Sequence, residues 1–269
     1  MRARVNSQIA QELLDTGRLS SFRVIDTHGH MGEWSGIWFP RPSAEDMVST
    51  MDRCGVEWQV FAHHDALQNP AAGNLKAQAA IDKFPDRLIG YYAVNPNYPD
   101  QLAEAVKGFG HLRGFAGYKI LAGYYATVIT DPPCRPLWEH AHEAKLPVLL
   151  HTWGGDQFAG CRQVREIAQK YPGATLLMGH SQYGDWDGAI QLARELPNVY
   201  SELTAAHAVN GLIEKMVAEG IEDKITFGTD LPWFDPMYAI GCVVFARIGD
   251  TARRKILRDN AAVIFQRWL

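Results

Sequence analysis

The sequence has few of the features that mark several common protein classes. Its four cysteines, Cys54, Cys134, Cys161 and Cys242, lie far apart and form no C-x-x-C pair. This spacing argues against a thiolate zinc site and against a disulfide framework. No stretch approaches the roughly 18 apolar residues of a membrane-spanning helix, and the N-terminus lacks the apolar core of a signal peptide. We therefore expect a cytoplasmic protein with no membrane partner.

Positive charge is also scarce. The 26 Lys and Arg residues are outnumbered by 30 Asp and Glu residues, which gives a formal net charge of -4, and no basic run or interleaved aromatic platform occurs. This balance argues against a nucleic-acid partner. The sequence also lacks a G-x-S-x-G elbow, a P-loop and a G-x-G-x-x-G loop, so serine hydrolase and nucleotide-driven chemistry are not supported. The expected partner is a small-molecule substrate.

What the chain does contain is a regular alternation of strand and helix patterns. Eight strand patterns, each followed by a helical pattern, occur at 24–30, 56–62, 88–94, 114–121, 147–150, 174–178, 199–203 and 225–230. Strict alternation predicts a parallel sheet, and eight units predict a closed (β/α)8 TIM barrel, an α/β fold. A doubly wound open sheet is the alternative, although such sheets usually have fewer strands.

No linker or repeat divides the chain, so we expect a single domain. Residues 1–22 are expected to form an N-terminal helical extension, and residues 23–269 the metal-dependent barrel. Because barrels of this kind often pair, a homodimer is the default expectation.

The first strand pattern, Val24 to His30, ends in two histidines two residues apart. Side chains at i and i+2 of a strand share one face, so His28 and His30 are expected to project side by side. Two adjacent imidazoles are suited to binding one metal ion. The alternative is a pair of structural histidines with ordinary hydrogen bonds.

Other polar residues stand at the ends of later strand patterns. His151 ends the fifth, His180 the sixth and Asp230 the eighth. Active sites of these barrels lie at the carboxyl ends of the strands, and closure places strand eight beside strand one. Asp230 is therefore expected next to the histidine pair, with His151 reaching the same ion from across the mouth. Imidazole and carboxylate donors suit a divalent metal, and we expect one zinc ion, with manganese as the alternative.

These motifs, taken together, resemble the amidohydrolase superfamily. They are D-T-H-G-H at 26–30, L-L-H-T-W at 149–153, M-G-H-S at 178–181, F-G-T-D at 227–230 and K-I-L-R-D-N-A-A-V-I-F at 255–265. In particular they resemble the amidohydrolase-related branch, which includes aminocarboxymuconate semialdehyde decarboxylase. The resemblance implies that His28, His30, His151 and Asp230 bind the metal. It also implies that His180 handles protons or stabilises charge, and that Asp230 is both ligand and base.

Two further ionisable residues stand on strand patterns. Lys119 ends the fourth pattern, where two-metal members of the superfamily carry a carbamylated lysine that bridges the ions. In a one-metal site it would instead bind an anionic group of the substrate or keep its charge at the base of the loop. Glu202, on the seventh pattern, needs a partner if it is buried, and a role near the metal is one way to supply it.

The loops at the catalytic end supply candidates for substrate binding. Trp153 and Trp233 are expected to form part of an apolar wall suited to a planar or cyclic substrate. One of His63 and His64, taken here as His64, is expected to face the barrel axis and touch the substrate. Arg41 is the arginine best placed to meet a substrate carboxylate.

We expect a hydrolase in which metal-bound hydroxide, deprotonated by Asp230, attacks an amide, lactone or ester of a small carboxylate-bearing or cyclic substrate. The alternative is a non-oxidative decarboxylase of an aromatic or unsaturated acid, because the same ligands serve both reactions. A third hypothesis is a barrel that has lost catalysis and serves as a binding or scaffold protein, although the intact ligand set argues against it.

Overall fold

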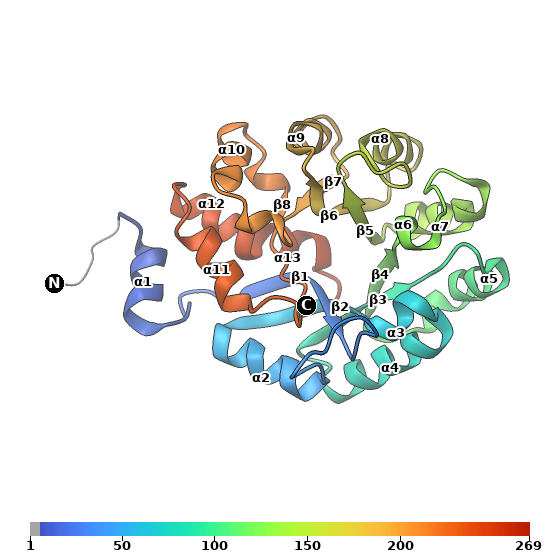
Figure 1. The fold of residues 1–269 in the computed structure, drawn as a ribbon, viewed down its shortest axis with the longest axis horizontal. Helices are drawn as coiled ribbons and strands as arrows, with labels where there is room; N and C mark the ends of the chain where they lie inside the picture. Colours follow the sequence, from blue (N-terminus) through green and yellow to red (C-terminus); the bar gives the residue numbers. More distant parts are fainter. Residues whose placement is uncertain (1–5) are drawn as a thin grey trace.

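The computed structural model describes residues 6–269, in which eight parallel strands stand side by side in chain order with the helices outside them (Figure 1). The strands are β1 (Val24–Met31), β2 (Val56–His63), β3 (Leu88–Ala93), β4 (Phe115–Ile120), β5 (Pro147–Trp153), β6 (Thr175–Tyr183), β7 (Val199–Glu202) and β8 (Ile225–Thr226). The predicted single-domain (β/α)8 barrel is confirmed. The doubly wound alternative is wrong, because the strand order never reverses.

Helices follow most of the strands and cover the outside of the barrel (Figure 1). They are α1 (Gln8–Thr16), α2 (Ala44–Cys54), α3 (His64–Gln68), α4 (Pro70–Lys83), α5 (Pro99–Gly108), α6 (Ala122–Tyr125), α7 (Arg135–Ala144), α8 (Cys161–Lys170), α9 (Trp186–Glu195), α10 (Leu212–Ala218), α11 (Pro236–Val244), α12 (Asp250–Arg254) and α13 (Asn260–Phe265). A π-helical turn, Lys255–Asp259, joins α12 to α13. Within residues 6–269, no helix combines the length and the apolar character needed to cross a membrane.

The ends of α2 illustrate how the sequence sets the helix boundaries. The Ser43 side chain accepts a hydrogen bond from the Asp46 amide at the start, and Gly55 adopts a left-handed conformation with φ 78° at the end. A serine N-cap satisfies a free amide of the first turn, and glycine adopts positive φ without strain. Met47 and Met51, at helical spacing, are fully buried against the barrel. Ser43 and Gly55 thus set the two ends of α2.

The barrel closes through backbone hydrogen bonds that lie beyond the short strand β8. The Thr27 amide donates to the Phe227 carbonyl (2.8 Å), and the Asp230 amide donates to the His28 carbonyl (2.7 Å). The predicted strand over 225–230 is therefore wrong at its end, since β8 stops at Thr226. The physical reason is that β8 pairs with β7 only at Ile225 and Thr226, and the residues after Thr226 make separate backbone hydrogen bonds to β1 instead of continuing the ladder.

Two carboxylates hold helix α1 in place, Asp250 at its start and Glu12 in its middle. Ser7 and the Gln8 amide donate to Asp250 at 2.5 and 2.9 Å. Glu12 accepts from the amides of Ser20 and Ser21 at 2.7 and 2.8 Å. Residues 1–5 of the expected extension lie outside the described residues. The extension is thus joined to the barrel through Asp250 at the start of α1, while the Glu12 hydrogen bonds connect α1 to the residues that lead into β1.

The Glu12 contacts predict a pH-dependent contribution to stability. Burial raises the pKa of the Glu12 carboxyl, but hydrogen bonds from Ser20 and Ser21 outweigh it and lower the pKa from 4.5 to about 2. A depressed folded-state pKa stabilises the fold above pH 4.5, and this contribution is lost as the pH falls toward 2. We expect Glu12→Gln to lower the Tm at pH 7 and to differ less from wild type at about pH 3. Thermal melts at both pH values measure this difference. Glu33→Gln, at an exposed position, is the control; a Glu12→Gln difference that does not change with pH contradicts the account.

Candidate active site

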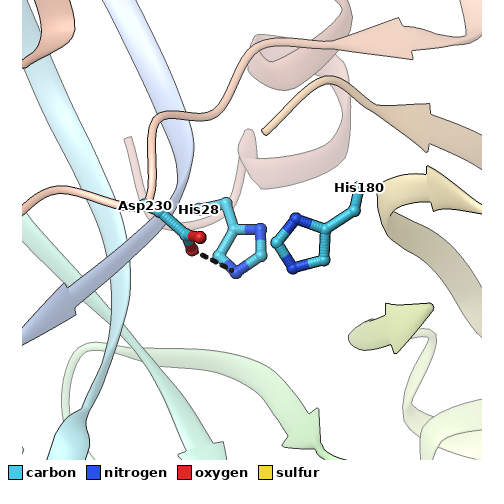
Figure 2. A group of neighbouring side chains, drawn as sticks. All are labelled: His28, His180 and Asp230. Carbon is cyan, nitrogen blue, oxygen red and sulfur yellow. Dashed lines mark ion pairs between the residues drawn. The ribbon is translucent and has the colours of Figure 1, made fainter. Parts of the chain in front are cut away.

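Four imidazoles and one carboxylate meet at the carboxyl ends of the strands. His28 and His30 come from β1, His151 from β5, His180 from β6, and Asp230 from the segment after β8. Asp230 Oδ1 lies 3.1 Å from His28 Nε2 and 3.2 Å from His30 Nε2. Ligand atoms of His28, His180 and Asp230 all lie within 4.8 Å of one another, as Figure 2 shows. The His151 ring lies 4.7 Å from the His180 ring, centroid to centroid, although His151 is outside this closest group.

The protein fixes the orientation of three of these imidazoles through their Nδ1 atoms. The contacts are His28 to the Glu202 carboxylate (2.6 Å), His30 to the Ala62 carbonyl (3.2 Å) and His180 to the Thr204 carbonyl (3.3 Å). Carbonyl and carboxylate oxygens accept hydrogen bonds, so each Nδ1 carries the proton and each Nε2 is left with a lone pair. Imidazoles that bind metals are commonly oriented by a hydrogen bond of this kind.

These donors fit a divalent cation. Asp230 Oδ1 is buried and has no hydrogen-bond partner among residues 6–269, although two Nε2 atoms lie within 3.2 Å of it. Lone pairs that face a carboxylate oxygen repel it unless a positive charge lies between them. Burial raises the pKa of Asp230, but His28, His30 and His180 outweigh it and hold that pKa well below its ordinary value. Burial also lowers the pKa of His180 to about 3, which keeps this imidazole neutral at pH 7.

Glu202 has the partner that its position on the seventh strand required. It is fully buried; Oε2 accepts from His28 Nδ1, and Oε1 accepts from the amide and hydroxyl of Thr204, both at 2.7 Å. Burial raises the pKa of Glu202 to about 7. Since Glu202 and His28 are 174 residues apart, the sequence alone identified the need for a partner but not the partner.

Sequence reasoning missed Asp26, which joins the two sides of the site. Its Oδ1 accepts from the amides of His28 (3.0 Å) and Thr229 (3.2 Å), and so ties β1 to the segment that carries Asp230. The residue is fully buried, and burial raises the pKa of Asp26 to about 8. The signal was an acidic residue inside an otherwise apolar strand pattern, two positions before His28.

The backbone is strained where two of these side chains are presented. Asp230 has φ 60°, and His180, Ser181 and Gln182 have φ 66°, 50° and 52°. Non-glycine residues rarely adopt this conformation, and it persists where the surrounding structure imposes it. Here the Ser181 hydroxyl donates to the Glu202 carbonyl (2.8 Å), and the Gln182 amide donates to the Thr152 hydroxyl (3.1 Å).

Lys119 is buried in β4 with its ammonium at the donor cluster. Its Nζ donates to His28 Nε2 at 3.0 Å, and its side chain is only 1% exposed. Burial lowers the pKa of Lys119 to about 8. Lys119 therefore lies near the end of the fourth strand, as predicted. A bridging role for it between two ions stays a prediction.

A cavity of about 220 Å³ opens onto these residues, and most of its wall is aromatic or apolar. Its lining includes Trp34, Tyr124, Trp153, Trp233 and Phe234, together with His64, Lys119 and members of the donor cluster. His64, Lys119, Trp153 and Trp233, all predicted to bind substrate, therefore line one cavity. A wall of this composition suits a flat, apolar ring whose polar group points toward the histidines.

Arg41 does not have the predicted position. It is not among the residues that line the cavity, and its Nε instead donates to Asp46 at 3.1 Å in the first turn of α2. Its side chain is 58% exposed. The prediction failed because a carboxylate five residues away offers this guanidinium a local partner outside the cavity.

His64 is held by hydrogen bonds at both of its nitrogens. Its Nδ1 donates to the Gly32 carbonyl (2.7 Å), and its Nε2 accepts from Trp233 Nε1 (3.0 Å). The ring also stacks on His30, with centroids 5.0 Å apart, and burial lowers the pKa of His64 to about 3. Because neither nitrogen is free, His64 positions Trp233 and His30 rather than offering a proton to a substrate.

The comparison with known families agrees with this geometry. The model of the amidohydrolase family matches residues 25–267. The chain belongs to the amidohydrolase family. The resemblance inferred from the strand-end motifs is thereby confirmed, and so is the expectation of an enzyme.

Among related proteins, the γ-resorcylate decarboxylase of Rhodococcus jostii (strain RHA1) is 23% identical, over 68% of this chain and 72% of its own. A 5-carboxyvanillate decarboxylase from Novosphingobium aromaticivorans, solved with manganese and 4-hydroxy-3-methoxy-5-nitrobenzoic acid, superposes with a TM-score of 0.71. It is 14% identical and covers 91% of this chain and 96% of its own. A 2,6-dihydroxybenzoate decarboxylase from Rhizobium gives a TM-score of 0.74 at 17% identity, covering 91% and 99%. At these identities the solved structures establish the fold.

The expectation of a hydrolase is wrong. The curated relative described above, a γ-resorcylate decarboxylase, supports the alternative reaction instead. The motifs could not separate the two reactions, because the same histidines and aspartate serve both. The two reactions differ in their reacting groups: in hydrolysis water attacks a carbonyl carbon, and in decarboxylation a proton is added to a ring carbon. No short sequence motif distinguishes these two steps.

The close packing behind His28 can be tested at Gly228. A Cβ at this position would lie 2.0 Å from Glu202 Oε1 and 2.7 Å from His28 Cβ, so only glycine fits. We expect Gly228→Ala to lower the free energy of unfolding by about 1–3 kcal/mol, measured by chemical denaturation. Gly241→Ala, in α11 with nothing within 4 Å of its new Cβ, is the control. Equal stability of the Gly228→Ala and wild-type proteins would contradict the packing described here.

Proposed function

We propose that this protein is a metal-dependent, non-oxidative decarboxylase of an aromatic carboxylic acid. The observation that carries the proposal is a cavity with a largely aromatic wall that ends at the His30, His180 and Asp230 donors. The decarboxylase relatives support the same reaction. The cytoplasmic setting and the homodimer expected from the sequence stay predictions.

We propose His28, His30, His151 and Asp230 as the metal ligands. A bound divalent ion would polarise oxygens of the substrate and hold its acidic group at the end of the cavity. Zinc remains the prediction from the sequence, while the 5-carboxyvanillate decarboxylase was solved with manganese. Imidazoles suit zinc, and carboxylate with water suits manganese, so the donor set accepts either ion.

The residues around the cavity bind and orient the substrate. Trp34, Tyr124 and Trp233 line the cavity with ring surfaces against which a flat substrate ring would pack. The Lys119 ammonium, buried beside His28, supplies a positive charge for an anionic oxygen of the substrate. These contacts hold the substrate carboxylate close to His180.

We assign the proton transfer to His180. Its protonated form gives a proton to the ring carbon that bears the carboxylate. The bond from this carbon to the carboxylate then breaks, its electron pair restores the aromatic ring, and CO2 leaves. His180 regains a proton from solvent, so one proton is consumed in each turnover. Because burial lowers the pKa of His180 to about 3, its ring is neutral in the free enzyme and takes up the proton only in the reacting complex, where the nearby Asp230 carboxylate stabilises the protonated ring.

This proposal predicts CO2 release from hydroxybenzoic acids such as 2,6-dihydroxybenzoate by the metal-loaded enzyme. We expect His180→Gln and Asp230→Asn to lower kcat by about 100-fold or more, because the proton donor or its counter-charge is lost. His111→Gln, at an exposed position outside the cavity, is the control. CO2 trapping coupled to product analysis measures the reaction. A panel of such acids that releases no CO2 under these conditions would overturn the proposal.

Metal retention gives a second test that does not depend on the substrate. Glu202→Gln removes the carboxylate that orients His28, and we expect the metal affinity to fall by about 10–100-fold. Chelator competition with elemental analysis measures this affinity and identifies zinc or manganese. Glu195→Gln, at an exposed site on α9 where Glu195 pairs with Arg165, is the matched control. An unchanged affinity in Glu202→Gln argues against a metal on His28.

A further inference from the structure

A second cavity, of about 520 Å³, opens directly beside the first. Tyr124, His151 and Trp153 line both cavities, so the two spaces adjoin at these side chains. The outer space, here called the outer groove, is completed by Gly123, Gly154, Gly155, Asp156 and Phe158. The outer groove therefore begins at a proposed metal ligand and leads away from it between the segments that follow β4 and β5.

The wall of the outer groove offers aromatic faces and no free charge. Trp153 lies nearly parallel to His151, at 6.0 Å and 8°, and stacks on Tyr183 at 4.5 Å. Tyr124 and Trp153 remain 63% and 43% exposed. The Asp156 carboxylate is occupied, since it accepts from the amides of Phe158 (2.8 Å) and Ala159 (3.2 Å). Stacked, exposed rings without a free ionic partner favour a flat apolar group.

The outer groove is open because glycines form part of its lining. A Cβ at Gly155 would meet nothing within 4 Å, and a Cβ at Gly123 would meet only Phe158 Cδ2, at 3.8 Å. Gly155 has φ 74°, which favours glycine, but Gly123 lies in the short helix α6 and can accept a larger side chain. The space at Gly123 can therefore be filled by substitution without moving the backbone.

We propose that the substrate is an aromatic acid that carries a second flat, apolar group, such as an aryl ring, and that this group lies in the outer groove. The inference rests on the proposed decarboxylation. The inner cavity, at about 220 Å³, is smaller than typical ligand sites of about 300–1,000 Å³, and the outer groove extends it into that range. The carboxylate-bearing ring occupies the inner cavity, and the second ring lies against Tyr124, Trp153 and Phe158.

The test compares the turnover of two acids by the wild type and by a variant in which a larger side chain fills the outer groove. The acids are 2,6-dihydroxybenzoate and its 4-phenyl derivative, and the variant is Gly123→Leu, with Gly108→Leu in α5 as the control. For the wild type we expect kcat/KM to be at least about tenfold higher for the phenyl derivative, because its second ring is removed from water. Gly123→Leu is expected to abolish this preference, mainly through KM, and to leave the single-ring acid within about twofold. Circular dichroism and thermal melts confirm that both variants fold.

Equal kcat/KM for the two acids in the wild type, or an equal loss for both acids in Gly123→Leu, overturns the inference while the proposed function stands. If neither acid loses CO2, the proposed function fails, and equilibrium binding then tests the outer groove alone. Tighter binding of the phenyl derivative that Gly123→Leu abolishes supports the groove as its binding site. Equal binding of both acids to the wild type overturns the inference.

Discussion

The closure of the barrel around His28 is the constraint on which the rest of the structure depends. The His28 carbonyl accepts from the Asp230 amide, its own amide donates to Asp26, and its Nδ1 donates to Glu202. One residue of β1 therefore joins the first strand to the seventh and to the segment after the eighth. The bonds that close the barrel are the same bonds that place the donors, so fold and site form together.

The sequence predicted the parts of this arrangement that repeat or stand at strand ends. Eight strand patterns sufficed for the barrel, and His28, His180 and Asp230 followed from their places at its carboxyl rim. Contacts that join distant segments could not be predicted from the sequence. The partner of Glu202 lies 174 residues away, and β8 ends early because its pairing with β7 covers only Ile225 and Thr226. Arg41 failed for a local reason, because the nearby Asp46 binds it outside the cavity.

The reaction depends on features that the ligand motifs do not contain. A metal held by histidines and an aspartate can activate water or orient an acid, and the surroundings decide between them. Here the surroundings are aromatic rings. His64 accepts from Trp233 through Nε2 and donates to the Gly32 carbonyl through Nδ1, and Trp153 lines both the inner cavity and the outer groove. A wall of this kind would limit water at the ring carbon, which is why we propose protonation of carbon rather than hydrolysis.

The most direct test of the account is the position of a bound ion. Crystals grown with manganese, measured at the manganese absorption edge, would show the ion by its anomalous scattering. The account predicts one strong peak about 2 Å from Nε2 of His28 and His30 and from an oxygen of Asp230, and no such peak in His28→Ala crystals. A peak elsewhere in the barrel, or none at these side chains in the wild type, would contradict the assignment of this cluster as the metal centre.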